Sequence, residues 1–165
     1  KAGRKSCPLG LFFYWRWAIN EGAHVMQIKH MMSADIVTIK MDDTLAQVIG
    51  LFEHHNFHHL LVVEELKLVG VLSDRDLLKA ISPTVGTSAE TAKDAACLHK
   101  RVHQVMTRNP VTLSAESGLL LAIKTFNQYV VSCLPIVDED NRPVGILSWR
   151  DIFKFIESNQ LNKHA

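Results

Sequence analysis

The spacing of hydrophobic residues predicts two amphipathic helices. In two segments of the chain, four apolar residues follow the i, i+3, i+4, i+7 spacing that places side chains on one face of a helix. They are Leu45, Val48, Ile49 and Phe52 in the first segment, and Leu119, Ala122, Ile123 and Phe126 in the second. Asp43 and Ser117 precede these segments, where an N-cap is expected. Each helix is therefore expected to bury one face in a core.

Each predicted helix is followed by a pattern that indicates a β-hairpin. After the first helix, the apolar run 60–63 has the length of a short strand, the acidic pair 64–65 suits a turn, and a second apolar run covers 68–72. The same order of run, acidic turn and run recurs over 134–147. With a short strand before each helix and a second helix after each hairpin, each segment reads as βαββα.

The chain also contains an internal repeat that includes these elements. Gly70-Val-Leu-Ser-Asp-Arg-Asp76 recurs as Gly145-Ile-Leu-Ser-Trp-Arg-Asp151, and upstream Met32 is matched by Met106. Repetition of this kind defines the architecture before other signals are considered. A unit of about fifty residues is close to the lower limit for a core that is stable alone. The two copies are therefore expected to form one module.

The repeat divides the chain into parts. We expect an N-terminal extension at 1–25, a first copy at 26–81, a linker at 82–101, a second copy at 102–159 and a tail at 160–165. The linker begins with turn-forming residues, and its Ser88–Lys100 segment is predicted to form a helix.

These features, in the same order in both copies, resemble the tandem cystathionine β-synthase (CBS) domain pair, or Bateman module. The resemblance covers about residues 28–157 and rests on the Met before a short strand, the amphipathic helix, the apolar strand with its acidic turn, and Gly-hydrophobic-hydrophobic-Ser-x-x-Asp. It implies an α+β fold of two βαββα motifs related by a pseudo-twofold axis. It also implies a regulatory or sensor module. Such a module binds AMP, ADP, ATP or NAD between its motifs, transmits a conformational change, forms a homodimer and acts on an unidentified regulated protein.

The resemblance places the ligand in two clefts, each combining the Ser-x-x-Asp of one copy with the first strand and the start of the second strand of the other. In the family, the aspartate holds ribose hydroxyls, and the serine with the helix N-terminus helps to hold phosphate. One cleft is expected to contain Ser73, Asp76, Asn109, Pro110, Val111, Ser132 and Cys133. The other is expected to contain Ser148, Asp151, Asp35, Ile36, Val37, His58 and His59. The second cleft has two histidines as phosphate donors and is expected to bind more tightly.

Several junction residues have two interpretations. Gly70 and Gly145 can let the backbone approach a ligand closely. Arg75 and Arg150 can contact phosphates or can be solvated charges on surface helices. Ser-x-x-Asp before an apolar run is also a capping box that needs no ligand, and a cap does not exclude a binding site.

Two other functions compete with nucleotide binding: a protein-interaction module with vacant clefts, and a metal- or redox-responsive protein that uses Cys133 and the nearby histidines. His54 with His58, or His55 with His59, has the i, i+4 spacing of a chelating pair on a helix. The repeat predicts that the helix ends near His55 and that a strand begins by His59, so no metal site is predicted. There is no Gly-x-Ser-x-Gly, His-Glu-x-x-His or P-loop motif to support an enzyme.

Composition narrows the class of protein. A formal net charge of +1 over 165 residues, without a basic stripe, gives no electrostatic case for nucleic acid. Cys7, Cys97 and Cys133 lie far apart without a CxxC motif, which favours a reducing, cytoplasmic compartment. The apolar stretch within 1–25 is interrupted by Arg16 and too short for a bilayer, so no membrane partner is expected. Its aromatic residues are expected to cover an apolar surface of the module or of a neighbouring chain.

Overall fold

The structure is a computed structural model that describes residues 26–54 and 57–161. The first copy contains η1 (Ile28–His30), β1 (Thr38–Lys40), α2 (Leu45–His54), β2 (His59–Glu64), β3 (Lys67–Ser73) and α3 (Asp74–Ala80). The linker contains α4 (Ala92–Ala96) and η2 (Cys97–His99). The second copy contains η3 (Val102–Gln104), β4 (Thr107–Arg108), β5 (Leu113–Ser114), α5 (Leu119–Tyr129), β6 (Cys133–Val137), β7 (Pro143–Ser148) and α6 (Trp149–Leu161). The predictions for residues 1–25, His55 and most of the C-terminal tail lie outside the described residues.

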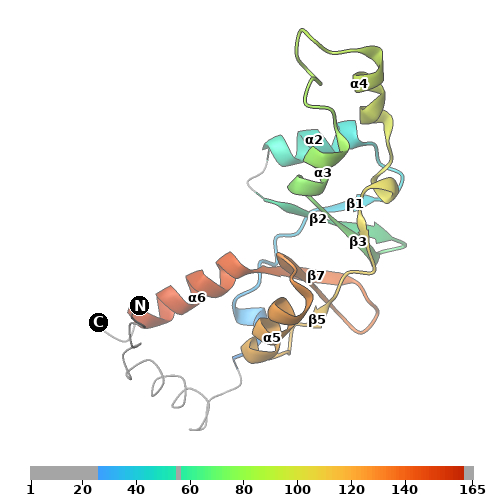
Figure 1. The fold of residues 1–165 in the computed structure, drawn as a ribbon. Helices are drawn as coiled ribbons and strands as arrows, with labels where there is room; N and C mark the ends of the chain where they lie inside the picture. Colours follow the sequence, from blue (N-terminus) through green and yellow to red (C-terminus); the bar gives the residue numbers. More distant parts are fainter. Residues whose placement is uncertain (1–25, 55–56, 162–165) are drawn as a thin grey trace, which may run out of the picture.

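The strands form two sheets, each built around the hairpin of one copy. The first has the order β1-β2-β3-β4 and the second the order β5-β6-β7. In both sheets the strand before the helix is parallel to the first hairpin strand, and the hairpin itself is antiparallel. The sheets lie between α2 and α3 on one side and α5 on the other (Figure 1). This arrangement confirms the predicted α+β fold with two pseudo-twofold-related βαββα copies.

Each copy pairs its leading segment with the sheet of the other copy. Strand β4 of the second copy is antiparallel to β3 of the first, with Gly70 opposite Arg108. Reciprocally, Ser33 of the first copy forms an antiparallel bridge with Ile146 on β7. The two copies are therefore joined by backbone hydrogen bonds in both directions.

The same exchange occurs in the hydrophobic cores. Ile28 and Met31, from the first copy, are buried among α5, β6 and β7 in what we call the second core. Val102 and Met106, from the second copy, are buried among α2, β2 and β3 in the first core. Because apolar burial is the main favourable term in folding, neither core is complete without the other copy.

The exchange also explains the repeated glycines. A Cβ atom on Gly70 would lie 2.6 Å from the sulfur of Met106 and 3.0 Å from the Thr107 carbonyl oxygen. A Cβ atom on Gly145 would lie 2.6 Å from the sulfur of Met32. The expectation that these glycines admit a ligand is therefore wrong: they make room for the methionine of the opposite copy.

Three local predictions need correction. The side-chain oxygens of Thr44 and Gln47 accept hydrogen bonds from each other's backbone N–H groups, so Thr44, not Asp43, caps α2. The N-cap of α5 is Gly118, not Ser117. The linker helix is shorter than predicted, because Thr91 and Asp94 form a capping box that starts α4 at Ala92.

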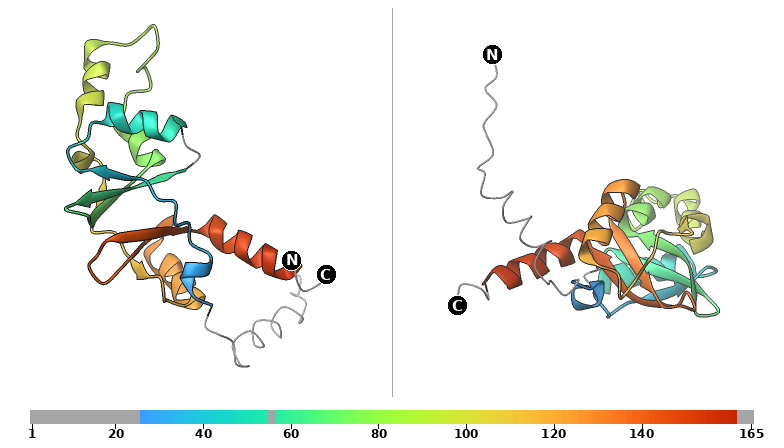
Figure 2. Two further views of the ribbon diagram at one scale, coloured as in Figure 1. Left: turned by 180° about the vertical axis from the view of Figure 1, so that it is seen from behind. Right: turned by 90° about the horizontal axis from the view of Figure 1, so that it is seen from below.

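Helix α6 differs from its counterpart α3 in length, with 13 residues against 7. It extends beyond the sheets (Figure 2) and exposes Phe153 and Ile156. Its start packs on α5, where the rings of Trp149 and Phe126 have centroids 4.4 Å apart. None of the helices in the described part of the chain has the length and apolar content needed to span a membrane.

Candidate functional site

A cavity of about 510 Å³ lies between the two copies. Its wall is formed by the segment before β1, the start of β2 and the N-terminus of α3 from the first copy, and by the end of β7 and the first two turns of α6 from the second. All of the residues expected in the Ser148/Asp151 cleft line it: Asp35, Ile36, Val37, His58, His59, Ser148 and Asp151. Sequence reasoning therefore brought together side chains that the fold places around one cavity.

The residues expected in the other cleft are divided. Ser73 and Ser132 line the same cavity, whereas Asp76, Asn109, Pro110, Val111 and Cys133 do not. Cys133 is buried in β6 opposite Ser148, and Val111 packs against the second core. The cavity is therefore lined by the serine of both Ser-x-x-Asp motifs but by the final aspartate of only the second motif, Asp151.

The aspartates of both motifs hold the start of a helix. The backbone N–H and the hydroxyl of Ser148 donate to Oδ2 of Asp151 at 2.8 and 2.6 Å. The hydroxyl of Ser73 donates to Oδ2 of Asp76 at 2.6 Å, and the N–H of Asp76 donates to the Ser73 hydroxyl at 3.2 Å, which completes a capping box. Among the described residues, every hydrogen bond to Asp151 ends on Oδ2, so Oδ1 can accept further bonds. The capping box is therefore confirmed for Ser73 and Asp76, and the carboxylate of Asp151, which accepts both bonds from Ser148 on Oδ2, keeps Oδ1 available.

The apolar wall lies just before the first strand and not in it. β1 begins at Thr38, so Ile36 and Val37 precede it, which corrects their predicted placement. The Val37 carbonyl accepts a hydrogen bond from Leu61 N–H at 3.2 Å, which fixes the segment against β2. Both side chains are half-buried and line the cavity.

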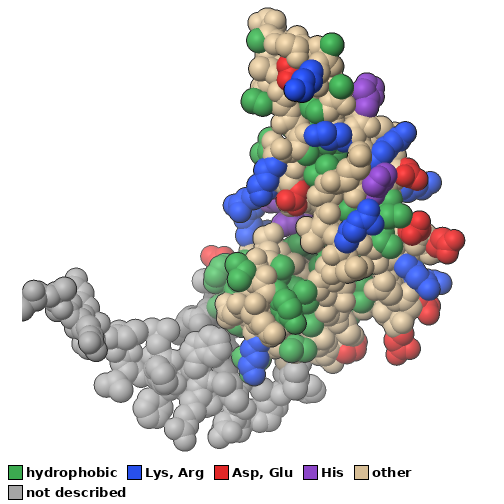
Figure 3. Space-filling model, turned by 45° about the vertical axis from the view of Figure 1, so that its right-hand side comes forward, with side chains coloured by type: hydrophobic (Ala, Val, Ile, Leu, Met, Phe, Trp, Pro, Cys, Tyr) green, Lys and Arg blue, Asp and Glu red, His purple; other side chains and the backbone are tan. Residues whose placement is uncertain are grey.

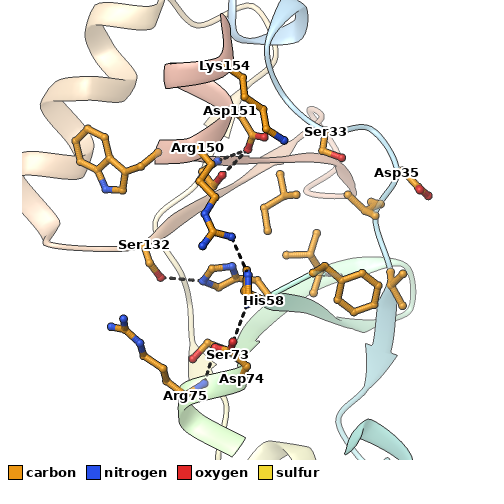
Figure 4. Close-up of a pocket in the computed structure, with 18 residues that line it drawn as sticks. Ser33, Asp35, His58, Ser73, Asp74, Arg75, Ser132, Arg150, Asp151 and Lys154 are labelled. Atoms are coloured by element: carbon orange, nitrogen blue, oxygen red, sulfur yellow. Dashed lines mark hydrogen bonds and ion pairs between the residues drawn. The ribbon is translucent and has the colours of Figure 1, made fainter. Parts of the chain in front are cut away.

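His58 connects the two copies across the cavity (Figure 4). Its Nδ1 lies 2.7 Å from Oδ2 of Asp74 at the N-terminus of α3, and its Nε2 lies 2.8 Å from Nη1 of Arg150 on α6. The prediction that the helix ends before the strand begins is confirmed, because α2 ends at His54 and β2 starts at His59. His58 therefore lies in the connection, where its ring reaches both helices.

His59 is more enclosed than His58 and has a different partner. Its Nε2 lies 2.8 Å from Oγ of Ser132. Burial lowers the pKa of His59, although the nearby Asp74 carboxylate opposes this effect. Both histidines expected to meet phosphate thus line the cavity, and in this structure their nitrogens contact protein groups.

Sequence reasoning missed Asp74 and Lys154. Asp74 occupies a variable position of the Ser-x-x-Asp motif, and its counterpart in the second copy is Trp149. Partial burial raises the pKa of Asp74, but hydrogen bonds from His58 and from Arg75 N–H outweigh it and lower the pKa overall. Lys154 lies one helical turn beyond Asp151, a spacing that could have identified it as a residue on the same face.

The charged residues of the cavity include three permanent cations. Arg75, Arg150 and Lys154 line it together with the carboxylates of Asp35, Asp74 and Asp151. Arg150 is exposed, and its guanidinium points toward His58 (Figure 4). Arg150 therefore lines the cavity, and its contact with a phosphate stays a prediction.

Two observations concern the metal- and redox-responsive alternative. Within residues 26–54 and 57–161, no three His, Cys, Asp or Glu side chains are grouped so that they could hold a metal ion. Burial raises the pKa of the Cys133 thiol to about 12. The reactive thiolate is therefore strongly disfavoured.

Comparisons with known proteins agree with the doubled architecture. The family model for the CBS domain matches residues 28–83 and again residues 102–158. A CBS domain-containing protein of Dictyostelium discoideum is 31% identical over 131 residues, which cover 78% of this chain and 90% of that protein. An inosine-5′-monophosphate dehydrogenase of Methanocaldococcus jannaschii is 32% identical over 142 residues, which cover 83% of this chain. The matched region is 26% of that enzyme, so the chain spans about a quarter of its length.

A solved structure has the same fold. The CBS domain pair of protein MJ0100, in complex with 5′-methylthioadenosine and S-adenosyl-L-methionine, matches with a TM-score of 0.65 at 26% sequence identity. The match covers 79% of this chain and 99% of that chain. The two-copy module is therefore shared over nearly the whole of that domain pair.

Proposed function

This chain belongs to the CBS domain family, and we propose on that premise that it is a regulatory module whose central cavity binds an adenosine-containing ligand. The observation that carries the proposal is the arrangement of Asp151, the segment 35–37 and the basic residues around a single cavity. Three parts of an adenosine nucleotide can be matched to three parts of its wall.

Asp151 is the proposed contact for the ribose. Two vicinal hydroxyls need an acceptor, and a carboxylate oxygen that carries no other hydrogen bond is suited to both. Oδ2 of Asp151 holds the start of α6, so the carboxylate is held in place while Oδ1 stays available. The helix cap thus prepares the contact with the ligand instead of competing with it.

The segment 35–37 is the proposed contact for the adenine. Ile36 and Val37 provide apolar surface for the faces of the base, and the segment precedes the β1 ladder, so part of its backbone can pair with the base edge. A volume of about 510 Å³ falls within the range of roughly 300 to 1,000 Å³ that is usual for small-ligand sites.

Arg75, Arg150 and Lys154 are the proposed contacts for phosphate. Guanidinium groups form charge-assisted and often bidentate hydrogen bonds to phosphate oxygens. This favours AMP, ADP, ATP or NAD over an uncharged nucleoside. The MJ0100 domain pair, at 26% identity, was solved with two ligands that contain adenosine, which supports recognition of that common part.

A thermal unfolding assay with a ligand panel tests this function. A ligand that binds only the folded state at a concentration of about 100 times its Kd stabilises it by about 2.7 kcal/mol. We expect AMP, ADP, ATP or NAD to raise the Tm by about 5 to 10 °C for a chain of this size. GMP is the control, because it has the same phosphate and ribose with a different base. Equal shifts with GMP, or no shift with any adenosine compound, would contradict the proposal.

We also propose that the module forms a homodimer through α5 and α6. Large apolar side chains are exposed there, namely Leu120, Leu121, Tyr129, Val130, Phe153 and Ile156. Figure 3 shows hydrophobic side chains gathered on the lower part of the molecule, which is the second copy. Exposed apolar surface of this kind favours association.

Light scattering at tens of micromolar is expected to report twice the 18.6 kDa chain mass, and Phe153→Asp is expected to reduce it to one chain mass. A wild-type monomer would contradict this assembly.

Ligand binding between the copies offers a physical route to regulation. The cavity wall combines α3 of one copy with α6 of the other, so a ligand that contacts both helices shifts the equilibrium between their relative positions. We propose that an unidentified protein partner responds to this change.

A further inference from the structure

We propose that a phosphate group in the cavity takes Arg150 away from His58, and that His58 gains a proton from solvent in exchange. The inference rests on the proposed function, because it requires a ligand with a phosphate. It makes His58 a proton-linked contact, so that ligand affinity depends on pH. Three side chains carry it: Asp74, His58 and Arg150.

The partners of the His58 ring fit one assignment of donors and acceptors. A guanidinium has only donors and stays charged, so Nε2 of His58, 2.8 Å from Nη1 of Arg150, must be the acceptor. The single ring proton is then on Nδ1, which donates to Oδ2 of Asp74 at 2.7 Å. The Asp74 carboxylate, the neutral His58 imidazole and the Arg150 guanidinium thus form a row of hydrogen bonds that links α3 to α6 (Figure 4).

A proton on Nε2 is incompatible with this row, because two donors would then face each other. A phosphate removes the conflict, since its oxygens are stronger acceptors for a guanidinium than a neutral imidazole nitrogen. Arg150 is exposed on the first turn of α6 and can turn away without uncovering a core. Nε2 is then available, and an imidazolium between the Asp74 carboxylate and a phosphate oxygen is favoured by both neighbours.

The other charged groups around His58 are compatible with the release of Arg150 and the uptake of a proton by His58. They are Asp74 and Arg75 from α3, Arg150, Asp151 and Lys154 from α6, Asp35 from the segment before β1, and His59 from β2. Asp74 is the carboxylate in direct contact, and its lowered pKa keeps it ionised near neutral pH. Burial lowers the pKa of His59, which disfavours uptake of the proton by this second histidine.

Isothermal titration calorimetry of the full chain with AMP tests the exchange. At about pH 7 the phosphate is largely dianionic, since its second pKa is about 6, so most protons taken up on binding go to the protein. Titration in buffers of different ionisation enthalpy counts these protons. We expect uptake of up to one proton per AMP, no uptake with adenosine, and AMP affinity that rises as pH falls from about 8 to 7. The limit is about tenfold per pH unit for one full proton.

His58→Gln keeps a side chain of similar size that cannot titrate, and it is expected to lose both the proton uptake and the pH dependence. His54→Gln is the matched control, because His54 is exposed on α2 outside the cavity and contacts the Gly50 carbonyl. This control is expected to show wild-type proton uptake. Nitrogen NMR of the His58 ring is expected to show the Nδ1–H tautomer without AMP and two protonated nitrogens with AMP.

The outcomes distinguish a failure of the proton uptake by His58 from a failure of the proposed nucleotide binding. If AMP binds but the His58 ring stays neutral, or if His58→Gln takes up as many protons as wild type, the exchange is wrong and the proposed function stands. If His59→Gln alone abolishes uptake, the exchange is also wrong, because the proton then belongs to the other histidine. If neither AMP nor adenosine binds, both the inference and the proposed function fail.

Discussion

Replacing Asp151 with Asn is expected to weaken the binding of AMP by about 1 to 3 kcal/mol, or about 5- to 150-fold. The amide oxygen of the new side chain can still accept the two bonds from Ser148 that hold α6. Its NH2 group then stands where Oδ1 was, and it offers a donor to ribose hydroxyls that also need to donate. The substitution thus removes the ligand contact while it keeps the helix cap. Calorimetry with AMP and with adenosine measures the loss.

Asp76→Asn is the matched control for this experiment. Asp76 likewise accepts hydrogen bonds from the N–H and the hydroxyl of Ser73, but it does not line the cavity. We expect this variant to weaken AMP binding by less than Asp151→Asn. If Asp151→Asn lowers the Tm but leaves AMP affinity intact, the motif is a capping box alone. If the two variants lose affinity equally, the assignment of the ligand to the Asp151 junction is wrong.

Replacing Ile28 with Ala is expected to lower the free energy of unfolding by about 2 to 5 kcal/mol. The Ile28 side chain is 0% exposed, although the residue lies near the start of the described chain. It fills part of the second core, beside Phe126 and Leu147, so its truncation leaves a cavity in the half to which it does not belong by sequence. Urea denaturation followed by circular dichroism measures the change, and we expect a single transition because the exchanged segments make the two cores interdependent.

Met26→Ala is the control for this second prediction. Met26 is 45% exposed, and its backbone carbonyl, which the substitution retains, accepts the hydrogen bond from Leu119 N–H. A change within about 0.5 kcal/mol is expected. A similarly small effect of Ile28→Ala would show that the leading segment does not complete the second core.

The repeat made the fold predictable, but it did not reveal the exchange of segments. Hydrophobic spacing located α2 and α5, and the two apolar runs with their acidic turn located the hairpins. Ile28 and Val102 precede these elements and look the same from sequence whichever core they enter. Which core they fill depends on where the chain crosses between sheets, and this is a property of the tertiary fold.

The candidate site was predictable as a set of residues but not as a set of contacts. The family resemblance brought together Asp151, His58 and the segment 35–37, and the fold places them around one cavity. Asp74 was missed because the second copy has Trp149 at the matching position. The comparison of the two copies therefore did not mark Asp74 as a repeated residue. The roles of Gly70 and Gly145 were misread, because the methionines that pack on them come from the other copy.

The most direct test of the nucleotide site is a crystal structure of the protein with AMP. The expected result is one AMP in the central cavity, with the ribose hydroxyls on Asp151, the adenine against Ile36 and Val37, and the phosphate beside Arg150. AMP bound only at the Asp76 junction, or a cavity that contains no AMP when the ligand is in large excess, would contradict it.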